Sequence, residues 1–269
     1  MTAGMNVETE ESPATETSPV NSAASDIQPN SWFWKNFDND KSESVTKRYA
    51  RITRASRRYS VRRQTVSQRT YEFCKRVIDI VITLPVVFFF SPFLLAVGIA
   101  TKLYDGGPMF FRQIRVGRYG EPFMCYKIRT MIPNADAMKA KLADLNQHSN
   151  GVTFKAPQDP RITPLGRLLR KSSIDELPQF INVLQGQMSL VGPRPAVPCE
   201  VIKYEGRDFQ RLLVKPGITC IWQVSGRGDV DFAGQVEMDV TYVRNRSLWL
   251  DFRLMLKTIP AVFGMKGAY

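Results

Sequence analysis

Two neighbouring acids, Asp175 and Glu176, are the residues of this sequence best suited to chemistry. They follow Ser173, and the spacing Ser173-x-x-Glu176 is that of a helix capping box. In a purely structural interpretation, Glu176 closes this box and Asp175 favours the positive end of a helix beginning near Ser173. In a chemical interpretation the two carboxylates have different roles in phosphoryl transfer: one attacks phosphorus and the other helps to hold a metal.

Basic residues on nearby turns favour the chemical interpretation. They lie on glycine- or proline-containing turns that are poor in acids: Arg161, Arg167, Arg170, Arg194, Lys215 and Arg227. An arginine fork matches two phosphate oxygens with parallel hydrogen bonds. Such a set suits phosphoryl transfer, in which positioning and charge neutralisation supply most of the catalysis.

Composition restricts the remaining chemistry. The chain has 269 residues and a net charge of +12, which allow one catalytic domain with appendages and indicate a polyanionic partner. A single histidine, His148, argues against histidine triads and multi-histidine metal sites. The four cysteines are far apart in the sequence, which argues against a zinc ribbon or a disulfide framework and suits a reducing cytosol. The sequence contains no P-loop and no G-x-G-x-x-G motif.

The charge of the sequence changes abruptly within its first 71 residues. Residues 1–46 are polar and acidic, and we expect a disordered tail rather than a secretory signal. Residues 47–71 are strongly basic and precede an apolar segment. Because basic clusters beside an apolar segment attract anionic headgroups, we expect this juxtamembrane part to contact membrane lipids.

The apolar segment 77–100 is long enough to cross a bilayer. Pro85 and the pair Ser91-Pro92 interrupt it, and a proline removes a helical hydrogen bond and kinks the helix. Both flanks are basic, so both favour the cytoplasmic side. These residues alone leave two topologies open: a spanning helix, or a re-entrant hairpin over 72–104 that breaks in the middle.

The rest of the chain, 105–269, is expected to be the catalytic domain, with an α+β fold that is mostly helical. Two apolar-basic runs around a turn at 117–120 predict a small β-hairpin within 106–131. The segment 214–228 is interpreted as a strand between glycine turns. Besides the helix near Ser173, apolar spacing predicts helices over about 132–146, 163–171, 232–245 and 249–264.

Several ordered strings carry a resemblance to a known family. They are "CKRVIDIVI", "SPFLLAVGI", "GGPMFFRQIRVGRYGEPFMCYKIRTM", "DPRITPLGRLLRKSSIDELPQFINVLQGQMSLVGPRP", "VKPGITCIWQVSGR" and "SLWLDFRLMLKTI". From about Lys75 to Tyr269 the sequence resembles the monotopic polyprenyl-phosphate phosphoglycosyl transferases, the bacterial sugar transferase family. The final "GAY" resembles the larger relatives that prime exopolysaccharide synthesis.

The resemblance implies a reaction and a location. A sugar-1-phosphate would pass from a nucleoside diphosphate sugar, typically a UDP-sugar, to undecaprenyl phosphate or a similar polyprenyl phosphate, with release of UMP. Magnesium (Mg²⁺) and a covalent aspartyl intermediate would take part, with Asp175 as the nucleophile and Glu176 beside it, both near the metal. The protein would lie at the bacterial inner membrane, with its catalytic domain on the cytoplasmic face and Ser91-Pro92 at the break of a re-entrant hairpin. The sugar, the final glycan and the oligomeric state, including a homodimer, stay open.

The resemblance also implies roles for other residues. Lys127, Arg194, Arg227 and Asp251 match functionally implicated positions. The full predicted substrate-binding set is Lys127, Arg161, Arg170, Arg194, Pro195, Gln223, Arg227 and Asp251. Each of the matched residues has a structural alternative: an exposed strand residue for Lys127, a turn brace for Arg194, a solvated turn for Arg227 and a helix N-cap for Asp251. Cys220 departs from the glycine that is frequent in smaller relatives, so their sugar preference does not transfer.

Two other functions compete with this interpretation. The net charge of +12 and the basic segment would also suit a membrane-tethered nucleic-acid-binding protein. Such a protein would bind DNA or RNA in a salt-sensitive manner without Asp175, whereas the phosphoglycosyl transferase interpretation requires no nucleic acid. A catalytically inactive scaffold of the same family is the second alternative, and the intact "SIDELPQ" argues against it.

Overall fold

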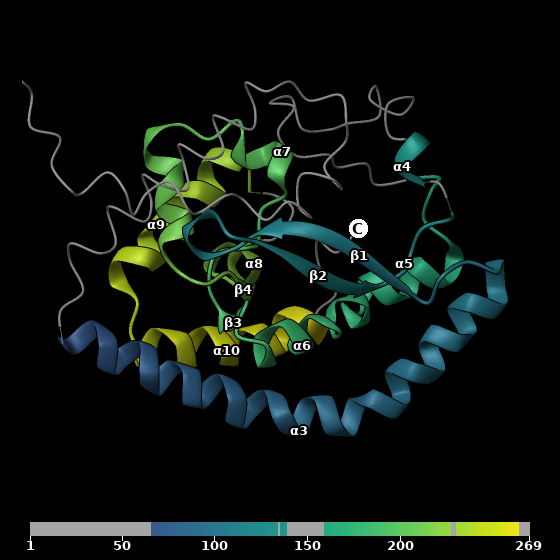
Figure 1. Cartoon of the computed structure of the whole chain (residues 1–269), viewed down its shortest axis with the longest axis horizontal. Coiled ribbons are helices and arrows are strands. Elements are labelled where there is room, and N and C mark those ends of the chain that lie inside the picture. Colours follow the sequence, from purple (N-terminus) through teal and green to yellow (C-terminus); the bar gives the residue numbers. More distant parts are fainter. Residues whose placement is uncertain (1–65, 134, 139–158, 227–229, 264–269) are drawn as a thin grey trace, which may run out of the picture. The chain divides into compact units, whose positions relative to one another are not determined.

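The computed structural model describes residues 66–133, 135–138, 159–226 and 230–263, all within one compact unit, Ser42–Tyr269. Within these residues the fold is mostly helical, as the sequence predicts, and it contains two small sheets, of which the sequence predicts only the β-hairpin (Figure 1). The predicted tail over 1–46 and most of the basic segment over 47–71 lie outside the described residues.

The predicted β-hairpin is confirmed. Strand β1 (Phe110–Val116) pairs antiparallel with β2 (Pro122–Ile128), and the short helix η2 (Arg118–Gly120) makes the turn. The register places Phe111 opposite Lys127 and Gln113 opposite Cys125. Directly opposed residues share a face of the sheet, so the odd-numbered side chains of both strands project on one side.

The second sheet is short and parallel, and it corrects one prediction. Strand β3 (Ser189–Val191) pairs with β4 (Gly217–Thr219), and the helix α8 (Ile221–Ser225) follows β4. The strand predicted over 214–228 is therefore wrong beyond residue 219, because a short apolar run does not distinguish a strand from a buried helical turn. A Cβ on Gly217 would lie 2.1 Å from the backbone nitrogen of Gly192, so only glycine allows this close approach.

The helices confirm most of the predicted ranges. Residues with the expected periodicity form α5 (Pro164–Lys171), α9 (Phe232–Asn245) and α10 (Leu248–Phe263), and α4 (Ala135–Met138) is the described part of the helix predicted over 132–146. The remaining short elements are η4 (Ile174–Glu176), α6 (Gln179–Leu184), α7 (Pro198–Val201) and η5 (Gly206–Leu213).

The capping box predicted at Ser173 is not formed. Ser173 adopts a left-handed conformation with φ 57°, and its side chain makes no capping hydrogen bond. A capping serine needs an extended backbone, which this residue lacks. Instead of a long helix, the single turn η4 carries Asp175 and Glu176, and α6 begins after Pro178.

The longest helix is α3 (Val66–Asp105), which contains 40 residues and both prolines. The sequence predicts a break at Ser91-Pro92, but helical turns continue through it, and Figure 1 shows a bent ribbon instead. Pro92 cannot donate to the carbonyl of Phe88 one turn earlier. The hydroxyl of Ser91 donates to that carbonyl at 3.0 Å, so the lost bond is replaced and the helix bends without ending.

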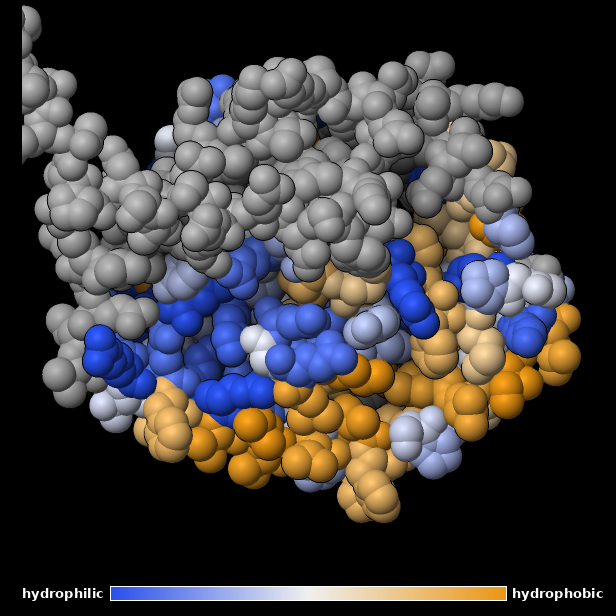
Figure 2. All heavy atoms as spheres, in the orientation of Figure 1, coloured by the Kyte–Doolittle hydropathy of each residue, from blue (hydrophilic) through white to orange (hydrophobic). Residues whose placement is uncertain are grey.

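The middle of α3 is apolar and exposed. Phe88 and Phe89 are 72% and 74% exposed, and Val81 is 64% exposed. By length and composition, α3 is apolar enough to cross a membrane. Figure 2 shows the corresponding band of hydrophobic atoms along this edge of the molecule.

The first half of α3 is fixed to the rest of the compact unit by polar contacts. Asp79 is 3% exposed and accepts hydrogen bonds from the hydroxyl of Ser189 at 3.1 Å and the backbone N–H of Leu190 at 3.0 Å. One turn earlier, Lys75 Nζ lies 2.8 Å from the carboxylate of Asp251 in α10. A buried acid in an apolar helix requires such partners, so this half of α3 has a defined position on the domain.

The other end of α3 contacts the same domain. Arg129, which follows β2, donates from Nε to the carbonyl of Pro108 at 2.7 Å and from Nη2 to that of Thr101 at 3.5 Å. Arg129 is buried and fills the space beside Gly107. Both ends of the apolar helix are therefore attached to one compact unit.

Two apolar clusters hold the elements that carry the site. Leu190, Val191, Val214, Tyr242 and Leu254 join β3 to α9 and α10. A second cluster, Phe123, Cys125, Val183 and Met188, joins β2 to α6. Together they fix the positions of the strand ends and turns that surround one pocket.

Candidate active site

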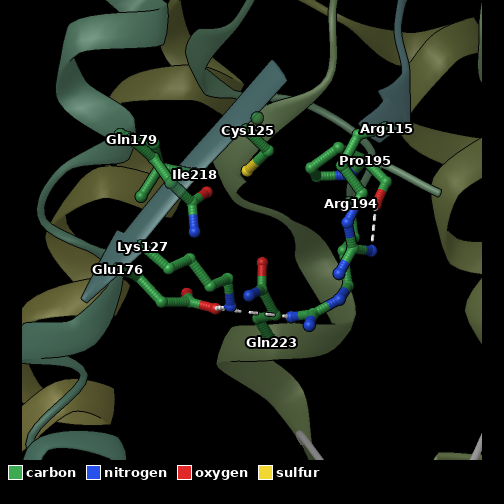
Figure 3. Close-up of a pocket in the computed structure, with 10 residues that line it drawn as sticks. Arg115, Cys125, Lys127, Glu176, Gln179, Arg194, Pro195, Ile218 and Gln223 are labelled. Atoms are coloured by element: carbon green, nitrogen blue, oxygen red, sulfur yellow. Dashed lines mark hydrogen bonds and ion pairs between the residues drawn. The ribbon is translucent and has the colours of Figure 1, made fainter. Parts of the chain in front are cut away.

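A pocket lies where the hairpin, η4, α6 and the second sheet meet (Figure 3). The sheet strands and α8 contribute Arg115, Cys125, Lys127, Gly217, Ile218 and Gln223, and the remaining lining residues are Glu176, Gln179, Arg194 and Pro195. Four residues of the predicted site line it: Lys127, Arg194, Pro195 and Gln223, together with Glu176 of the acidic pair. Its chemistry is therefore one carboxylate among several cationic and amide donors.

Glu176 is paired with two cations across this pocket. Its Oε1 lies 2.5 Å from Lys127 Nζ and 3.9 Å from Arg194 Nη1. Burial alone would raise the pKa of Glu176, but Lys127 and Arg194 outweigh it and lower this pKa below its ordinary value. Glu176 is therefore a carboxylate at neutral pH.

The pKa of Asp175 is shifted in the opposite direction. It is 7% exposed, and burial together with the charge of Glu176 raises its pKa to about 6, although Lys127, Arg170 and Arg194 act against this. Within the described residues its carboxylate accepts no hydrogen bond. Asp175 is thus a poorly solvated carboxylate whose oxygens are uncommitted, which is the condition of a reactive nucleophile.

The turn that carries Arg194 is held by the end of β1. Arg115 donates from Nη1 to the carbonyl of Pro195 at 2.8 Å, and the backbone N–H of Val116 donates to that of Ala196 at 2.9 Å. The Arg194 guanidinium lies 5.9 Å from the centre of the Trp222 ring. Among the described residues it donates no hydrogen bond, so its fork is available to an anion in the pocket.

Gln223 is oriented by Cys220. The thiol of Cys220 donates to Gln223 Oε1 at 3.0 Å. This contact leaves the amide nitrogen of Gln223 free to donate toward the pocket, which Gln223 lines. The pocket therefore offers guanidinium, ammonium and amide donors around Glu176 (Figure 3), whereas Asp175, the preceding residue, is not among the residues that line it.

Comparison with known proteins identifies the family of this chain. The family model described as bacterial sugar transferase matches residues 70–265. The chain belongs to the bacterial sugar transferase family. This membership favours the transferase interpretation over the nucleic-acid-binding alternative.

Three named proteins are similar in sequence to this sugar transferase. An undecaprenyl-phosphate galactose phosphotransferase of Salmonella typhimurium is 42% identical over 207 residues, 76% of this chain and 43% of the relative. The exopolysaccharide production protein ExoY of Rhizobium meliloti is 40% identical over 198 residues, 72% of this chain and 88% of the relative. A UDP-glucose:undecaprenyl-phosphate glucose-1-phosphate transferase of Caulobacter vibrioides is 38% identical over 203 residues, 72% of each chain. The chain thus spans less than half of the Salmonella relative and most of ExoY.

Two predicted arginines of the sugar transferase lie outside the pocket lining. Arg170 is close enough to Asp175 to influence its pKa, and its Nε donates to the hydroxyl of Thr130 at 2.9 Å. Arg161 is buried in an ion pair with Asp159, with N–O distances down to 2.6 Å. Arg227 lies outside the described residues.

Asp251 also lies away from the pocket lining. Its carboxylate accepts hydrogen bonds from Lys75 and Tyr71 of α3, each at 2.8 Å, and from Tyr242 of α9 at 2.7 Å. The N-cap alternative for Asp251 is wrong, because the hydroxyl of Ser247 accepts the capping hydrogen bond from Leu250 at 3.2 Å. In this structure Asp251 joins the membrane helix to the catalytic part.

Sequence reasoning missed five residues that line the pocket of the sugar transferase: Arg115, Cys125, Gln179, Gly217 and Ile218. A period-two pattern could have found Arg115 and Cys125, because they share the sheet face of Lys127. Gln179 is 4% exposed and begins α6, three residues after Glu176. No sequence signal identifies it, because its position depends on η4 replacing the predicted helix.

The acidic pair fits a particular kind of magnesium site. Among the described residues, no group of three or more histidine, cysteine, aspartate or glutamate side chains lies together. Mg²⁺ is commonly held by one or two carboxylates together with substrate phosphates, and the pair Asp175 and Glu176 suits this mode.

Proposed function

We propose that this protein transfers a sugar-1-phosphate from a UDP-sugar to a polyprenyl phosphate such as undecaprenyl phosphate. The observation that carries the proposal is the poorly solvated, uncommitted carboxylate of Asp175 beside Glu176, Lys127 and Arg194. Family membership supports it, since named relatives act on undecaprenyl phosphate. The product would begin assembly of a glycan such as an exopolysaccharide, capsule or O-antigen.

In the first step, a carboxylate oxygen of Asp175 attacks the sugar-linked phosphorus of the UDP-sugar. A carboxyl O–P bond forms, the bond to the bridging oxygen breaks, and UMP leaves with that oxygen. The guanidinium of Arg194 and the amide of Gln223 face the pocket and can bind the diphosphate. Lys127 keeps Glu176 ionised and offsets charge that would otherwise repel the diphosphate.

In the second step, a phosphate oxygen of the polyprenyl phosphate attacks the same phosphorus. The aspartyl O–P bond breaks, which regenerates the carboxylate of Asp175 and yields a polyprenyl diphosphosugar. The attacking phosphate is already anionic, so no general base is required. The same cations that bind the leaving UMP phosphate can then bind the incoming one.

Mg²⁺ would be held by Asp175, Glu176 and phosphate oxygens of the substrate, and it would screen the repulsion between carboxylate and diphosphate. The protein's own residues supply the remaining charge neutralisation. Lys127 and Arg194 flank Glu176 on the pocket side, and the charge of Arg170 offsets part of the rise that burial causes in the pKa of Asp175.

We also propose that α3 enters one leaflet and returns to the same side. A helix that crosses the bilayer has its ends about 30 Å apart on opposite sides, so one cytoplasmic domain would contact only one end. Here Asp79 and Lys75 near one end, and Thr101 near the other, contact the same compact unit. With basic flanks on both sides, this supports a catalytic domain on the cytoplasmic face of the bacterial inner membrane.

UMP release tests the proposed function. Wild type and Asp175→Asn are purified and given magnesium, undecaprenyl phosphate and a panel of UDP-sugars. Lipid-dependent UMP release by the wild type, absent in Asp175→Asn, is the expected result and names the sugar. Equal UMP release by both proteins would refute the role of Asp175.

A further inference from the structure

Lys215 is a half-buried cation on the turn that leads into β4. Within the described residues, its ammonium group has no hydrogen-bond or ion-pair partner. It is not among the residues that line the active-site pocket. The charge of this half-buried lysine is therefore available to an anionic ligand.

A second cation lies beside Lys215. A Cβ placed on Gly186 would lie 3.6 Å from Arg76 Nη2 and 3.7 Å from Lys215 Nζ. The two cationic groups therefore flank a residue without a side chain, and one oxyanion can reach both. The pKa of Lys215 is lowered by burial and by the positive charges of Arg76 and Arg118, as expected where like charges are held together.

The acids in this region are already engaged. The carboxylate of Glu72 accepts two hydrogen bonds from Arg118, at 2.5 and 2.8 Å. The carboxylate of Asp79 accepts from a serine hydroxyl and a backbone N–H of β3. Neither acid is within salt-bridge distance of Lys215. The positive charge of Lys215 is therefore left without a close counter-charge.

Helix capping accounts for Arg76 but not for Lys215. Arg76 donates to two main-chain carbonyls at the end of α6, at 2.5 and 2.7 Å, where a cation offsets the negative end of the helix dipole. Lys215 makes no such hydrogen bond. A structural explanation of the pair thus covers only one of its members.

The pair lies at the depth of lipid headgroups if α3 enters the membrane. Arg76 directly precedes the apolar segment, and its neighbours Phe73 and Val77 are 70% and 44% exposed. Figure 2 shows hydrophilic atoms bordering the hydrophobic band along this edge. Headgroup phosphates lie at this boundary and attract basic side chains there.

We propose that Arg76, Gly186 and Lys215 form a second anion site that binds the phosphate group of a membrane lipid. The lipid is either an anionic phospholipid or the polyprenyl phosphate acceptor, and the latter case rests on the proposed function. Lys215 precedes Gly217 and Ile218, which line the active-site pocket. Lys215 is therefore only two residues before a residue of the pocket lining.

Lipid binding by the full chain tests this site. The protein is purified in a neutral maltoside detergent without a sugar donor, and native mass spectrometry counts bound molecules. The separate probes are phosphatidylglycerol, undecaprenyl phosphate, inorganic phosphate and phosphate-free diacylglycerol. The variants are Lys215→Met, Lys215→Arg and, as a matched control after α7, Lys203→Met, with the unfolding temperature measured for each.

We expect Lys215→Met to weaken binding of one lipid phosphate by about ten-fold or more, because it removes a charge-assisted contact. Lys215→Arg should restore binding, which keeps the test valid if the methionine variant is unstable. The probe that loses affinity identifies the lipid, whereas Lys203→Met should match the wild type.

Two results would overturn the site: equal lipid binding by Lys215→Met and Lys203→Met, or inorganic phosphate that competes as tightly as either lipid. UMP release is assayed separately, with donor and acceptor present. Wild-type protein that binds lipid through Lys215 but releases no UMP would contradict the proposed function and leave this site standing.

Discussion

Lys127 Nζ lies 2.5 Å from Oε1 of Glu176, and this contact separates the behaviour of two adjacent acids. Burial alone would raise the pKa of Glu176, but the charge of Lys127 outweighs burial and lowers this pKa. Burial instead raises the pKa of Asp175 to about 6. Opposite shifts in neighbouring titratable groups indicate a division of roles. In the proposed mechanism the ionised Glu176 would help to hold the metal, and Asp175 would be the nucleophile.

Replacement of the cation tests this division. Lys127→Met should lower kcat/KM for UMP release by about ten- to hundred-fold, because the half-buried carboxylate of Glu176 loses a charge-assisted hydrogen bond worth about 1.5–3 kcal/mol. Lys257→Met removes an exposed lysine of α10 and should retain wild-type activity. Equal activity of the two variants would show that the Lys127 contact is not used in catalysis.

The pH profile should report the ionisation of Asp175. Because its pKa is raised to about 6, the carboxyl holds its proton at pH 5 and loses it by pH 7. The value of kcat/KM at saturating magnesium should therefore rise through about pH 6 and level off above it. A profile that is flat from pH 5 to pH 8, with folding intact at both limits, would contradict the raised pKa.

Replacement of Asp251 should lower the stability of the protein, although this residue lies outside the pocket lining. Asp251→Ala removes the acceptor of Lys75, Tyr71 and Tyr242, and loss of one partner of a buried charge pair costs about 3–5 kcal/mol. Thermal unfolding in detergent should show a drop of several degrees. As a control, Glu237→Ala breaks the exposed pair with Arg207 and should change stability by about 1 kcal/mol or less.

The topology of α3 can be tested through Pro92. With the wild type, tags at both chain ends should resist protease added to intact spheroplasts, because both lie on the cytoplasmic side. Pro92→Ala restores the N–H that can bond to the carbonyl of Phe88, so the helix should straighten and expose one tag. Ser91→Ala is the matched control: it removes the hydroxyl but keeps the proline, and both tags should stay protected. An exposed tag in the wild type would refute the re-entrant topology.

Local patterns predicted much of the fold because they depend on neighbouring residues. The hairpin around 117–120 and the helix Phe232–Asn245 follow from turn residues and apolar spacing. Of the ten residues that line the pocket, half were predicted. The acidic pair and the basic turns pointed to Glu176, Arg194 and Pro195, whereas Lys127 and Gln223 came with the family resemblance.

Tertiary contacts decided what the sequence did not predict. The left-handed backbone of Ser173 converts an expected helix start into the single turn η4. From the sequence, Asp251 was predicted to cap a helix or to bind substrate. Its actual partners Tyr71 and Lys75 are far away in the sequence, so only the packing of α3 against α10 identifies them. At Ser91-Pro92, the serine hydroxyl replaces the missing hydrogen bond, so the break expected from proline becomes a bend.

The most direct test of the mechanism is the intact mass of the protein after reaction with a UDP-sugar and magnesium, without polyprenyl phosphate. We predict an increase equal to one sugar-1-phosphate on the wild type, localised to Asp175 by peptide analysis and discharged when undecaprenyl phosphate is added. Asp175→Asn should gain no mass. Lipid-dependent UMP release without any such adduct on the wild type, even under rapid quenching, would contradict the covalent aspartyl step.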